Sequence, residues 1–448
     1  MNTAIEILFT SALGLHAPWA VTRVDLDTAK QRIDFEVGCQ LKQLDCPACG
    51  TSAQGIHDGP RRSWRHLDFF QYEAWLHAEV PRVACTACGK TTQVDVPWAR
   101  PDSGFTLLFE ALALSLCQSL PVAPAAAQLR VASKRLWRRI AHYVPAAREQ
   151  EIMTDVRVIG IDETSLKRGQ DDVTVVHDLK AKRLLFMTAG RRHDTMHQFK
   201  EDLSAHGGNP DEIEHACIDM SAAYTKGVTE ALPQAQISYD RFHVIALANA
   251  AMDAVRRNEM QTRPAEVRAT LGSDKATRKA LLWSMRKNPT DWSRKQTNAM
   301  HCLQHSNLQS ARAWRLKQAL RDVYTQGVEA NCEQQAEAAL LRWISWARRC
   351  RLEPFKRLAS TLTAHLPGIV RGMLDGRSNA YVEAMNGLLQ QTKTAARGFR
   401  TVSNFMAIAY LRMGKLTHLP KSPFVLALSR EHGVTRYRDG RQVPLETA

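Results

Sequence analysis

Two pairs of cysteines constrain the fold of the N-terminal part of this chain more than any other feature of its sequence. Each pair has the spacing Cys-x-x-Cys and is followed by glycine, in CPACG and CTACG. The four residues are Cys46, Cys49, Cys85 and Cys88. Such turns aim two thiolates at one ion, and four thiolates make a closed tetrahedral site of the structural zinc type. We therefore expect one structural Zn²⁺; the alternatives are two unrelated cysteine turns or a redox pair.

The sequence around the cysteines is typical of β-strands. WAVTRVDLD and QRIDFEV alternate in polarity, YEAWLHAEVPRV follows, and turn-forming residues separate these segments. Residues 1–100 are therefore predicted to form a β-rich zinc-binding head. Within it, the segment RRSWRH places Arg61, Arg62 and Arg65 around a tryptophan. Cations beside an aromatic ring suit a surface that contacts phosphates, and a solvated basic loop explains the segment equally well.

The charge balance favours a polyanionic partner. The 448 residues include 60 Lys and Arg against 45 Asp and Glu, a formal net charge of +15. Nucleic acid and an anionic membrane surface both fit this charge, as does a basic enzyme without such a partner. No stretch reaches the ~18 uninterrupted apolar residues of a membrane helix. The apolar start carries Glu6 and no Lys or Arg before Arg23, unlike a signal peptide. We expect a cytoplasmic protein that does not bind membranes.

Residues 101–150 change to helical spacing and are predicted to form a helix-turn-helix DNA-binding domain. PAAAQLRV is a short helix of small residues, and KRLWRRIAHY forms the second helix. Its apolar side would face inward. Its basic residues would project outward toward a major groove and its phosphates: Lys134, Arg135, Arg138 and Arg139. The alternative is a basic amphipathic helix on the surface.

The pattern from residue 155 onward predicts a multidomain α/β chain. Five apolar strands are expected in VRVIGID, VTVVHDL, RLLFMTA, EIEHACID and AQISYD. The first three are adjacent and the last two alternate with helices, as in an α/β sheet. Residues 243–371 are almost wholly helical. The predicted division is residues 151–260 for the first part of the core, 261–371 for a helical insertion, 372–425 for the second part, and 426–448 for a tail without an assigned role.

Three acids stand out by their positions. Asp162 ends VRVIGID, Asp219 ends HACID, and Glu383 lies in the helix SNAYVEAMNGLLQQ. Neighbouring parallel strands bring such carboxylates to one edge of a sheet, and a helix packed over that edge supplies the third. Close acids repel one another unless cations neutralise them, and oxygen ligands suit Mg²⁺ or Mn²⁺. Two such ions support in-line attack on a phosphodiester. On chemistry alone, strand-end acids that cap helices remain the alternative.

The order of these motifs resembles the ISL-three (ISL3) family of bacterial insertion-sequence transposases. The cysteine quartet, the basic helix-turn-helix, VIGIDE, CIDMSAAY, SYDRFHV and SNAYVEAMNGLLQQTKTAARGFR follow one another as in that family, over about residues 40–416. The resemblance implies a DDE transposase with an RNase H-like core that a helical insertion interrupts. It assigns the metal-binding catalytic roles to Asp162, Asp219 and Glu383. Ser221, where many relatives have Trp, departs from the pattern at a local packing contact.

One further element takes a role from this resemblance, and a group of basic residues takes one from its position on the helix and loop after Glu383. Asp240 and His243 form a D-x2-H element that related transposase groups share, which implies that His243 hydrogen-bonds a phosphate or orients the site. The alternative is a helix-capping aspartate and a buried histidine. Three basic residues follow Glu383 and would line the path of DNA: Lys393, Arg397 and Arg400. A solvated basic face is the alternative for these three.

Together these features predict a DNA transposase. The head and helix-turn-helix would bind terminal inverted repeats, and the core would cleave DNA by metal-dependent hydrolysis and join 3′-OH ends to target DNA. Double-stranded DNA is the expected partner, and a homo-oligomer is expected on it. The alternatives are a transposase-derived DNA-binding regulator and a structure-selective nuclease of the same fold. The presence of all three acids disfavours the regulator, and strand joining distinguishes a transposase from a nuclease.

Overall fold

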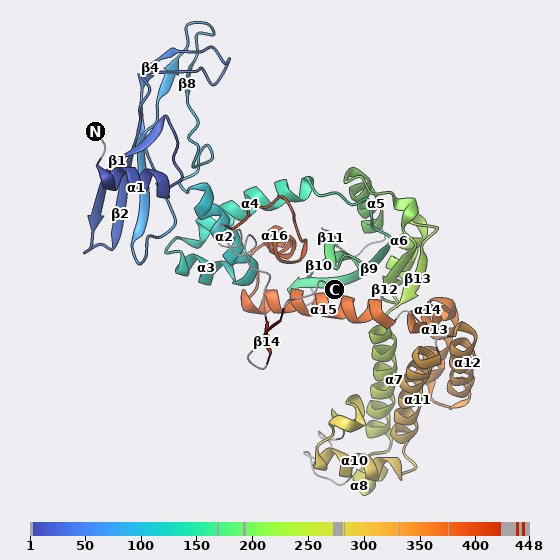
Figure 1. Cartoon of the computed structure of the whole chain (residues 1–448). Helices are drawn as coiled ribbons and strands as arrows, with labels where there is room; N and C mark the ends of the chain where they lie inside the picture. Colours follow the sequence, from blue (N-terminus) through green and yellow to red (C-terminus); the bar gives the residue numbers. More distant parts are fainter. Residues whose placement is uncertain are drawn as a thin grey trace. The chain divides into compact units, whose positions relative to one another are not determined.

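The computed structural model describes residues 3–167, 170–190, 194–271, 281, 283–330, 332–374, 376–422, 436–438 and 441–443. The chain divides into two compact units: residues 1–148 with the segment from residue 416 onward, and residues 149–415 (Figure 1). None of the described helices combines the length and the apolar composition that crossing a membrane requires.

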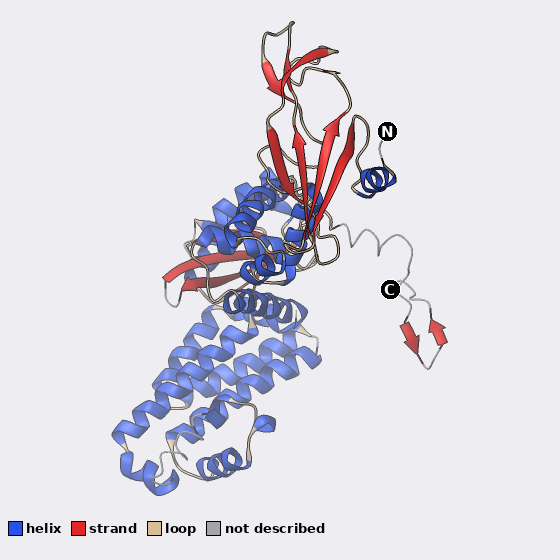
Figure 2. Ribbon diagram, turned by 90° about the vertical axis from the view of Figure 1, so that its left-hand side faces the viewer, coloured by secondary structure: helices blue, strands red, loops and turns tan. Residues whose placement is uncertain are grey.

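The first unit contains two four-stranded sheets, drawn in red in Figure 2. The larger has the order β1-β2-β6-β5, with β1 (Trp19–Asp27), β2 (Arg32–Cys39), β5 (Arg61–Arg65) and β6 (Glu73–Glu79). The smaller has the order β3-β4-β7-β8, with β3 (Gln43–Leu44), β4 (Gln54–Asp58), β7 (Arg82–Ala84) and β8 (Thr91–Gln93). The predicted strand WAVTRVDLD is β1. Val21, Phe35 and Trp64 are buried in the core of the larger sheet. Helix α1 (Ala4–Ala12), which the sequence did not predict, begins with a capping box between Thr3 and Glu6.

Three helices complete the described part of the first unit apart from a short hairpin. They are α2 (Leu107–Ser119), α3 (Val122–Gln128) and α4 (Ser133–Glu149). Helices α3 and α4 are the predicted pair. Leu136, Ile140 and Val144 are buried at every fourth position of α4, so this stripe fixes the helix against its neighbours. The hairpin consists of β14 (Arg436–Arg438) and β15 (Arg441–Val443).

The second unit is built on a five-stranded sheet with all five predicted strands. They are β9 (Val158–Lys167), β10 (Gln170–Asp178), β11 (Arg183–Ala189), β12 (His215–Ile218) and β13 (Gln236–Tyr239), in the order β11-β10-β9-β12-β13. β9, β10 and β11 pair antiparallel, whereas β9, β12 and β13 pair parallel. Short helices join the later strands: α5 (Thr195–Ala205), η1 (Pro210–Glu212) and α6 (Ala222–Ala231). The central strands are apolar because they are buried, as Ile159 and Val175 show.

The chain after β13 is helical. Its described elements are α7 (Arg241–Thr262), α8 (Pro264–Leu271), η2 (Pro289–Asp291), α10 (Arg294–Gln304), α11 (Gln309–Ala330), α12 (Glu333–Arg349), α13 (Glu353–Ala364), α14 (Leu366–Leu374), α15 (Gly376–Ala395) and α16 (Val402–Met413). Helices α7 and α11 run side by side away from the sheet (Figure 1). Ile159 of β9 belongs to the same buried cluster as Leu340 of α12, so the helices and the sheet share one core.

Helix α14 covers the edge strand β13. Gly368 and Gly372 approach Tyr239 so closely that a Cβ at either position would collide with it. Gly368 faces the Tyr239 ring and Gly372 faces the Tyr239 backbone, so only glycine permits this close approach. The Arg371 Nε donates to the backbone oxygen of Ile237 at 2.9 Å. The helical region is therefore fixed to the sheet beside the strands that carry the acids.

Candidate functional site

Two of the predicted acids lie at the same level on adjacent parallel strands. Cys217 of β12 pairs with Gly160 of β9. Asp162 follows Gly160 by two residues. Asp219 follows Cys217 by the same interval, just beyond the end of β12. The prediction that Asp162 ends its strand is wrong, because β9 continues to Lys167 through its pairing with β10. Beyond the last β9–β12 pair, however, the two aspartates lie where the sheet opens between these strands.

Burial and neighbouring charges shift the pKa of Asp162. Burial is the main cause that raises the pKa of Asp162, and the negative charge of Asp219 raises it further. Two effects oppose burial, and both are larger than that of Asp219: the backbone N–H of Glu163 donates to Asp162 at 2.6 Å, and the charge of His243 favours the ionised form. Asp219 accepts the backbone N–H of Ser221 at 2.9 Å. Asp162, Asp219 and His243 therefore lie within electrostatic reach of one another, and a cation between the acids would relieve their repulsion.

Helix α15 packs along β9 through one face. The Asn386 amide donates to the carboxylate of Asp162. One turn later Gln390 Nε2 donates to Thr164 Oγ1 at 3.3 Å, and Lys393 Nζ donates to the backbone oxygen of Ser165. These contacts come from positions spaced by four and three residues, which share one side of a helix.

The third predicted acid belongs to this helix. Glu383 lies in α15, three residues before Asn386, and its side chain lies outside the described residues. The sequence did not predict Asn386. Its spacing of three residues from Glu383 favours the same side of the helix but does not distinguish it from a surface amide. Of the basic residues predicted to line the DNA path, Lys393 is half-buried against β9, whereas Arg397 and Arg400 are exposed beyond the end of α15.

The first turn of α7 adds Asp240 and His243 to the site. Tyr239 pairs with Ile218, so Asp240 and Asp219 also follow a matched pair of residues. Asp240 is 4% exposed and caps α7, since its carboxylate accepts the backbone N–H of Phe242 at 3.0 Å. His243 is half-exposed, and its Nε2 lies 3.9 Å from the Asp240 carboxylate. The capping role of Asp240 is therefore present, but His243 is not the buried residue of the alternative interpretation.

The cysteine quartet comes together as predicted. The sulfur atoms of Cys46, Cys49, Cys85 and Cys88 all lie within 4.8 Å of one another. Each turn closes with a glycine N–H bond to the first cysteine carbonyl, at 2.8 Å for Gly50 and 3.0 Å for Gly89. Both glycines have positive φ, of 74° and 68°, which explains their place after each pair.

Local hydrogen bonds favour the thiolate at Cys49 and Cys85, whereas burial and the neighbouring cysteines raise the pKa of Cys88 to about 11. Hydrogen bonds from the side chain and backbone of Thr51 lower the pKa of Cys49 to about 6. The thiolate, which is the form that binds metal, is therefore favoured at this position. Four sulfur donors at mutual contact distance fit a tetrahedral zinc ion.

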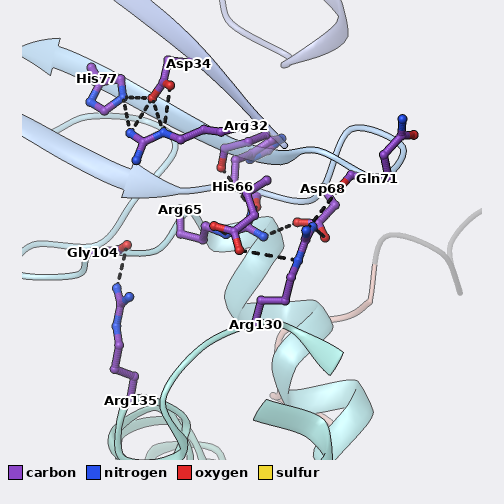
Figure 3. Close-up of polar contacts among 12 residues, drawn as sticks. Arg32, Asp34, Arg65, His66, Asp68, Gln71, His77, Gly104, Arg130 and Arg135 are labelled. Atoms are coloured by element: carbon purple, nitrogen blue, oxygen red, sulfur yellow. Dashed lines mark hydrogen bonds and ion pairs between the residues drawn. The ribbon is translucent and has the colours of Figure 1, made fainter. Parts of the chain in front are cut away.

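The basic helix α4 differs from its prediction. Lys134 and Arg138 are exposed. The guanidinium of Arg135 lies 3.9 Å from the ring centre of Phe105, and it donates to the carbonyl of Gly104 at 3.1 Å (Figure 3). Arg139 forms an ion pair with Glu110 at 2.7 Å. The expectation that all four cations project outward is therefore wrong for Arg135 and Arg139.

Glu110 of α2 explains the position of Arg139. Its carboxylate is fully buried and also accepts bonds from Arg100 at 2.9 Å, Ser103 at 2.8 Å and Tyr143 at 2.5 Å. Burial raises the pKa of Glu110, but the hydrogen bonds from Arg100, Tyr143, Arg139 and Ser103 outweigh it and lower the pKa to about 2. A buried charge requires such partners, so α4 turns an arginine inward.

The basic residues of the head also divide into two kinds. Arg65 is 1% exposed and pairs with Asp68 and Glu73, and Arg130 of the turn between α3 and α4 binds the same two acids (Figure 3). Arg65 therefore holds the sheet and the helices of this unit together rather than facing solvent. Arg61 is exposed beside Glu36, and Arg62 lies over the Trp64 ring at 5.5 Å.

Comparison with known protein families and proteins gives a consistent result. Residues 159–409 match a family model described as a transposase, and residues 94–144 match the helix-turn-helix domain of transposase family ISL3. Residues 43–88 match the zinc-finger of transposase IS204/IS1001/IS1096/IS1165.

Two similar proteins have the same description. The chain is 32% identical over 400 residues to the transposase for insertion sequence element IS1557 of Mycobacterium tuberculosis (strain ATCC 25618 / H37Rv), covering 84% of this chain and 87% of that protein. It is 25% identical over 373 residues to the transposase for insertion sequence element IS1001 of Bordetella parapertussis, covering 81% and 87%. Because the first family match spans more than half of the 448 residues and the other two precede it along the chain, the protein belongs to the ISL3 family of insertion-sequence transposases and is a DDE transposase.

Proposed function

We propose that the protein binds the terminal inverted repeats of its insertion sequence, hydrolyses a phosphodiester at each end, and joins the released 3′-OH to target DNA. The observation that carries this proposal is the alignment of Asp162 and Asp219 on adjacent parallel strands, with α15 packed on the first of them. We also propose that the chain is divided as its sequence predicts, with a helical insertion between two parts of the catalytic core.

The catalytic core is proposed to be RNase H-like. Three antiparallel strands followed by two parallel ones, in the order β11-β10-β9-β12-β13, support this assignment. The helices from α7 to α14 then form the insertion between β13 and the helix that carries Glu383. Their common core with the sheet lets them brace the acids.

Asp162, Asp219 and Glu383 are the proposed ligands of two Mg²⁺ or Mn²⁺ ions. When bound, such ions neutralise charge and activate the attacking water or 3′-hydroxyl. Asp162 and Asp219 lie on adjacent strands, and the helix that carries Glu383 packs on the first of them. The Asn386 amide fixes the orientation of the Asp162 carboxylate. His243 is placed to donate a hydrogen bond to a phosphate oxygen of the bound strand, so the protein contributes alignment and electrostatic stabilisation.

The first unit is proposed to bind DNA. Its cysteine quartet would hold one structural Zn²⁺ and so fix the smaller sheet. Lys134 and Arg138 would contact phosphates or bases in the major groove, with Arg61 and Arg62 as further contacts. Lys393, Arg397 and Arg400 would lie along the DNA near the acids, and the protein would act as a homo-oligomer on double-stranded DNA.

The experiment that tests this proposal uses purified protein, Mg²⁺, and DNA ends that flank its own gene. A labelled end and a plasmid target report cleavage and joining separately. Cleavage followed by joining of the 3′-OH end supports the proposal. Cleavage without joining indicates a nuclease, and end-binding without cleavage indicates a regulator. Omission of the divalent ion should abolish both chemical steps but leave end-binding intact.

A further inference from the structure

A cavity lined by cations lies beside the first turn of α7. Its volume is about 250 Å³. Arg241, Phe242 and Asn249 of α7 line it together with Lys317 and Arg321 of α11, and Arg286 contributes a further cation. This volume is just below the ~300 Å³ lower end of small-molecule sites, which suits one nucleotide rather than a longer segment.

Among the described residues, the hydrogen-bond and ring partners of three of these cations are neutral. Lys317 Nζ donates to the backbone oxygen of Met285 at 2.7 Å. Arg321 donates to the side-chain oxygen of Gln318 at 3.5 Å. The guanidinium of Arg241 lies 5.5 Å from the ring centre of Tyr324. By contrast, Arg286 pairs with Asp253 at 3.5 Å. The charges of Asp322 and Asp291 act on Arg321 from a distance. No described acid forms an ion pair with Arg241, Lys317 or Arg321, so the cavity still concentrates positive charge.

The three cations are close enough to affect one another. Burial lowers the pKa of Lys317 to about 8, and the charge of Arg321 adds to this effect. Burial also lowers the pKa of Arg321, and the charge of Arg241 adds to it. Lys317 is 1% exposed. Gathering like charges in a partly buried site is unfavourable unless an anion enters it.

The remaining lining residues suit a base. Phe242 is 58% exposed, so its ring is accessible for stacking. Asn249 Oδ1 is buried and has no hydrogen-bond partner among the described residues, so it can accept an N–H bond. Phe242 and Asn249 are seven residues apart and share one side of α7. A stacking ring, an open acceptor and guanidinium groups together match the chemistry of a nucleotide.

The position of the cavity connects it to the acids. Arg241 and Phe242 lie between Asp240, which caps α7, and His243, whose charge acts on Asp162. A DNA strand that crosses the acids would therefore bring a neighbouring nucleotide to the cavity.

We propose that this cavity holds one unpaired nucleotide of the DNA strand adjacent to the phosphate that is cleaved. Arg241, Lys317 and Arg321 bind its phosphate, Phe242 stacks on its base, and Asn249 accepts a hydrogen bond from the base. This inference rests on the proposed function, because it takes the acids as the place of cleavage. Removing one base from the double helix is the step that such a cavity makes possible.

The first test is photochemical crosslinking of full-length protein to DNA ends in Ca²⁺, which permits binding without requiring cleavage. 5-Iodouracil replaces one base at a time in both strands around the cleavage position. One position should crosslink to the peptide that contains residues 241–249, and Phe242→Ala should reduce this product at least tenfold. Crosslinks that map only to other peptides would overturn the proposal, whether or not the protein later proves to cleave DNA.

The second test compares cleavage by variants that fold as judged by circular dichroism. Phe242→Ala and Arg321→Gln should each slow cleavage about tenfold, whereas Arg315→Gln, which removes an exposed cation from the same helix, should not. An abasic site at the crosslinking position should slow the wild type and have no further effect on Phe242→Ala. Wild-type rates in both variants would contradict the proposal. If Asp162→Asn abolishes cleavage while Phe242→Ala and Arg321→Gln cleave at the wild-type rate, the proposed function holds and this inference fails.

A third arm distinguishes a DNA strand from a free anion. Inorganic phosphate and thymidine monophosphate are titrated into the protein, and its thermal unfolding is recorded. If either stabilises the wild type but not Arg321→Gln while DNA gives no crosslink to residues 241–249, the cavity is a site for a small anion and the proposal is wrong. If the DNA crosslink forms and millimolar phosphate does not displace it, the strand is the ligand.

Discussion

Asn386 on α15 donates a side-chain hydrogen bond to the Asp162 carboxylate on β9, across 224 residues of chain. The other amide atom, Asn386 Oδ1, is buried without a partner among the described residues. The bond connects the strand of one candidate ligand to the helix of another, Glu383. Because the Asn386 amide is neutral, its hydrogen bond orients the Asp162 carboxylate without neutralising it, so the negative charge can still bind a cation. This relationship leads to the first prediction.

Asn386→Ala should lower the cleavage rate by about 10–100-fold and raise the Mg²⁺ concentration needed for half-maximal rate, because residues that orient a metal ligand have effects of this size. Gln390→Ala is the matched control. Gln390 lies one turn further along α15 and binds the Thr164 hydroxyl rather than an acid. Equal effects of the two variants on the Mg²⁺ requirement would show that Asn386 only supports packing of the helix.

Asp162→Asn, Asp219→Asn and Glu383→Gln should each abolish cleavage while folding and end-binding persist. Each change removes a charge but keeps the shape of the side chain, so the loss of activity would come from lost cation binding. A strand-cleavage assay in Mg²⁺, with gel-shift binding to the same DNA ends, measures both properties. Binding of Asp162→Asn should equal or exceed that of the wild type, because a negative charge near DNA is removed. Any of the three that still cleaves at the wild-type rate is not part of the site.

The cysteine quartet should bind one Zn²⁺ per chain, as measured by elemental analysis of freshly purified protein. Cys46→Ser or Cys85→Ser should lower the zinc content well below one and expose the smaller sheet to protease, since structural zinc contributes folding free energy directly. Cys39→Ser is the control, because Cys39 lies at the end of β2 outside the quartet. A full zinc content in the quartet variants would mean that these cysteines do not hold the metal.

The features that the sequence predicted well depend on local pattern. The alternation of WAVTRVDLD and the apolar run VRVIGID identify strands because each strand's polarity follows from which of its faces is buried. The features that were predicted wrongly depend on distant partners. Asp162 does not end β9, because pairing with β10 extends the strand. Arg139 turns inward because Glu110 on another helix requires a cation. Asn386 carries no charge, so only its contact with Asp162 distinguishes it from a surface amide.

The cations of α4 should separate into two functional classes. Lys134→Ala with Arg138→Ala should weaken end-binding and flatten its salt dependence, by about 0.9 in the logarithmic slope for each lost phosphate contact. Arg139→Gln should instead lower the free energy of unfolding by about 2 kcal/mol, since it removes a charged hydrogen bond to a buried acid. Salt titrations of binding and thermal unfolding curves measure the two effects. An unchanged salt slope in the double variant would indicate that the head, around Arg61 and Arg62, binds the DNA ends instead.

The buried Glu110 carboxylate should make the stability of α2 and α4 fall in acid. Its pKa lies at about 2 in the folded protein against an ordinary 4.5. The unfolded chain therefore takes up a proton at a pH where the folded chain does not. The contribution of this group is fully present above about pH 4.5 and is lost as the pH falls toward 2. At about 1.4 kcal/mol for each pKa unit, the difference corresponds to about 3.5 kcal/mol.

Hydrogen exchange of the peptides that cover residues 107–149, followed by mass spectrometry of the full chain between pH 6 and pH 3, measures this effect. After correction for the intrinsic pH dependence of exchange, the wild type should lose protection in these peptides as the pH falls. Glu110→Gln should start with less protection at pH 6 and change less, so the two proteins converge in acid. Glu149→Gln, a change at an exposed position of α4, should follow the wild type. A constant difference between the wild type and Glu110→Gln would show that the carboxylate is not ionised through its bonds to Arg100, Arg139, Tyr143 and Ser103, and that these groups stabilise the unit through packing alone.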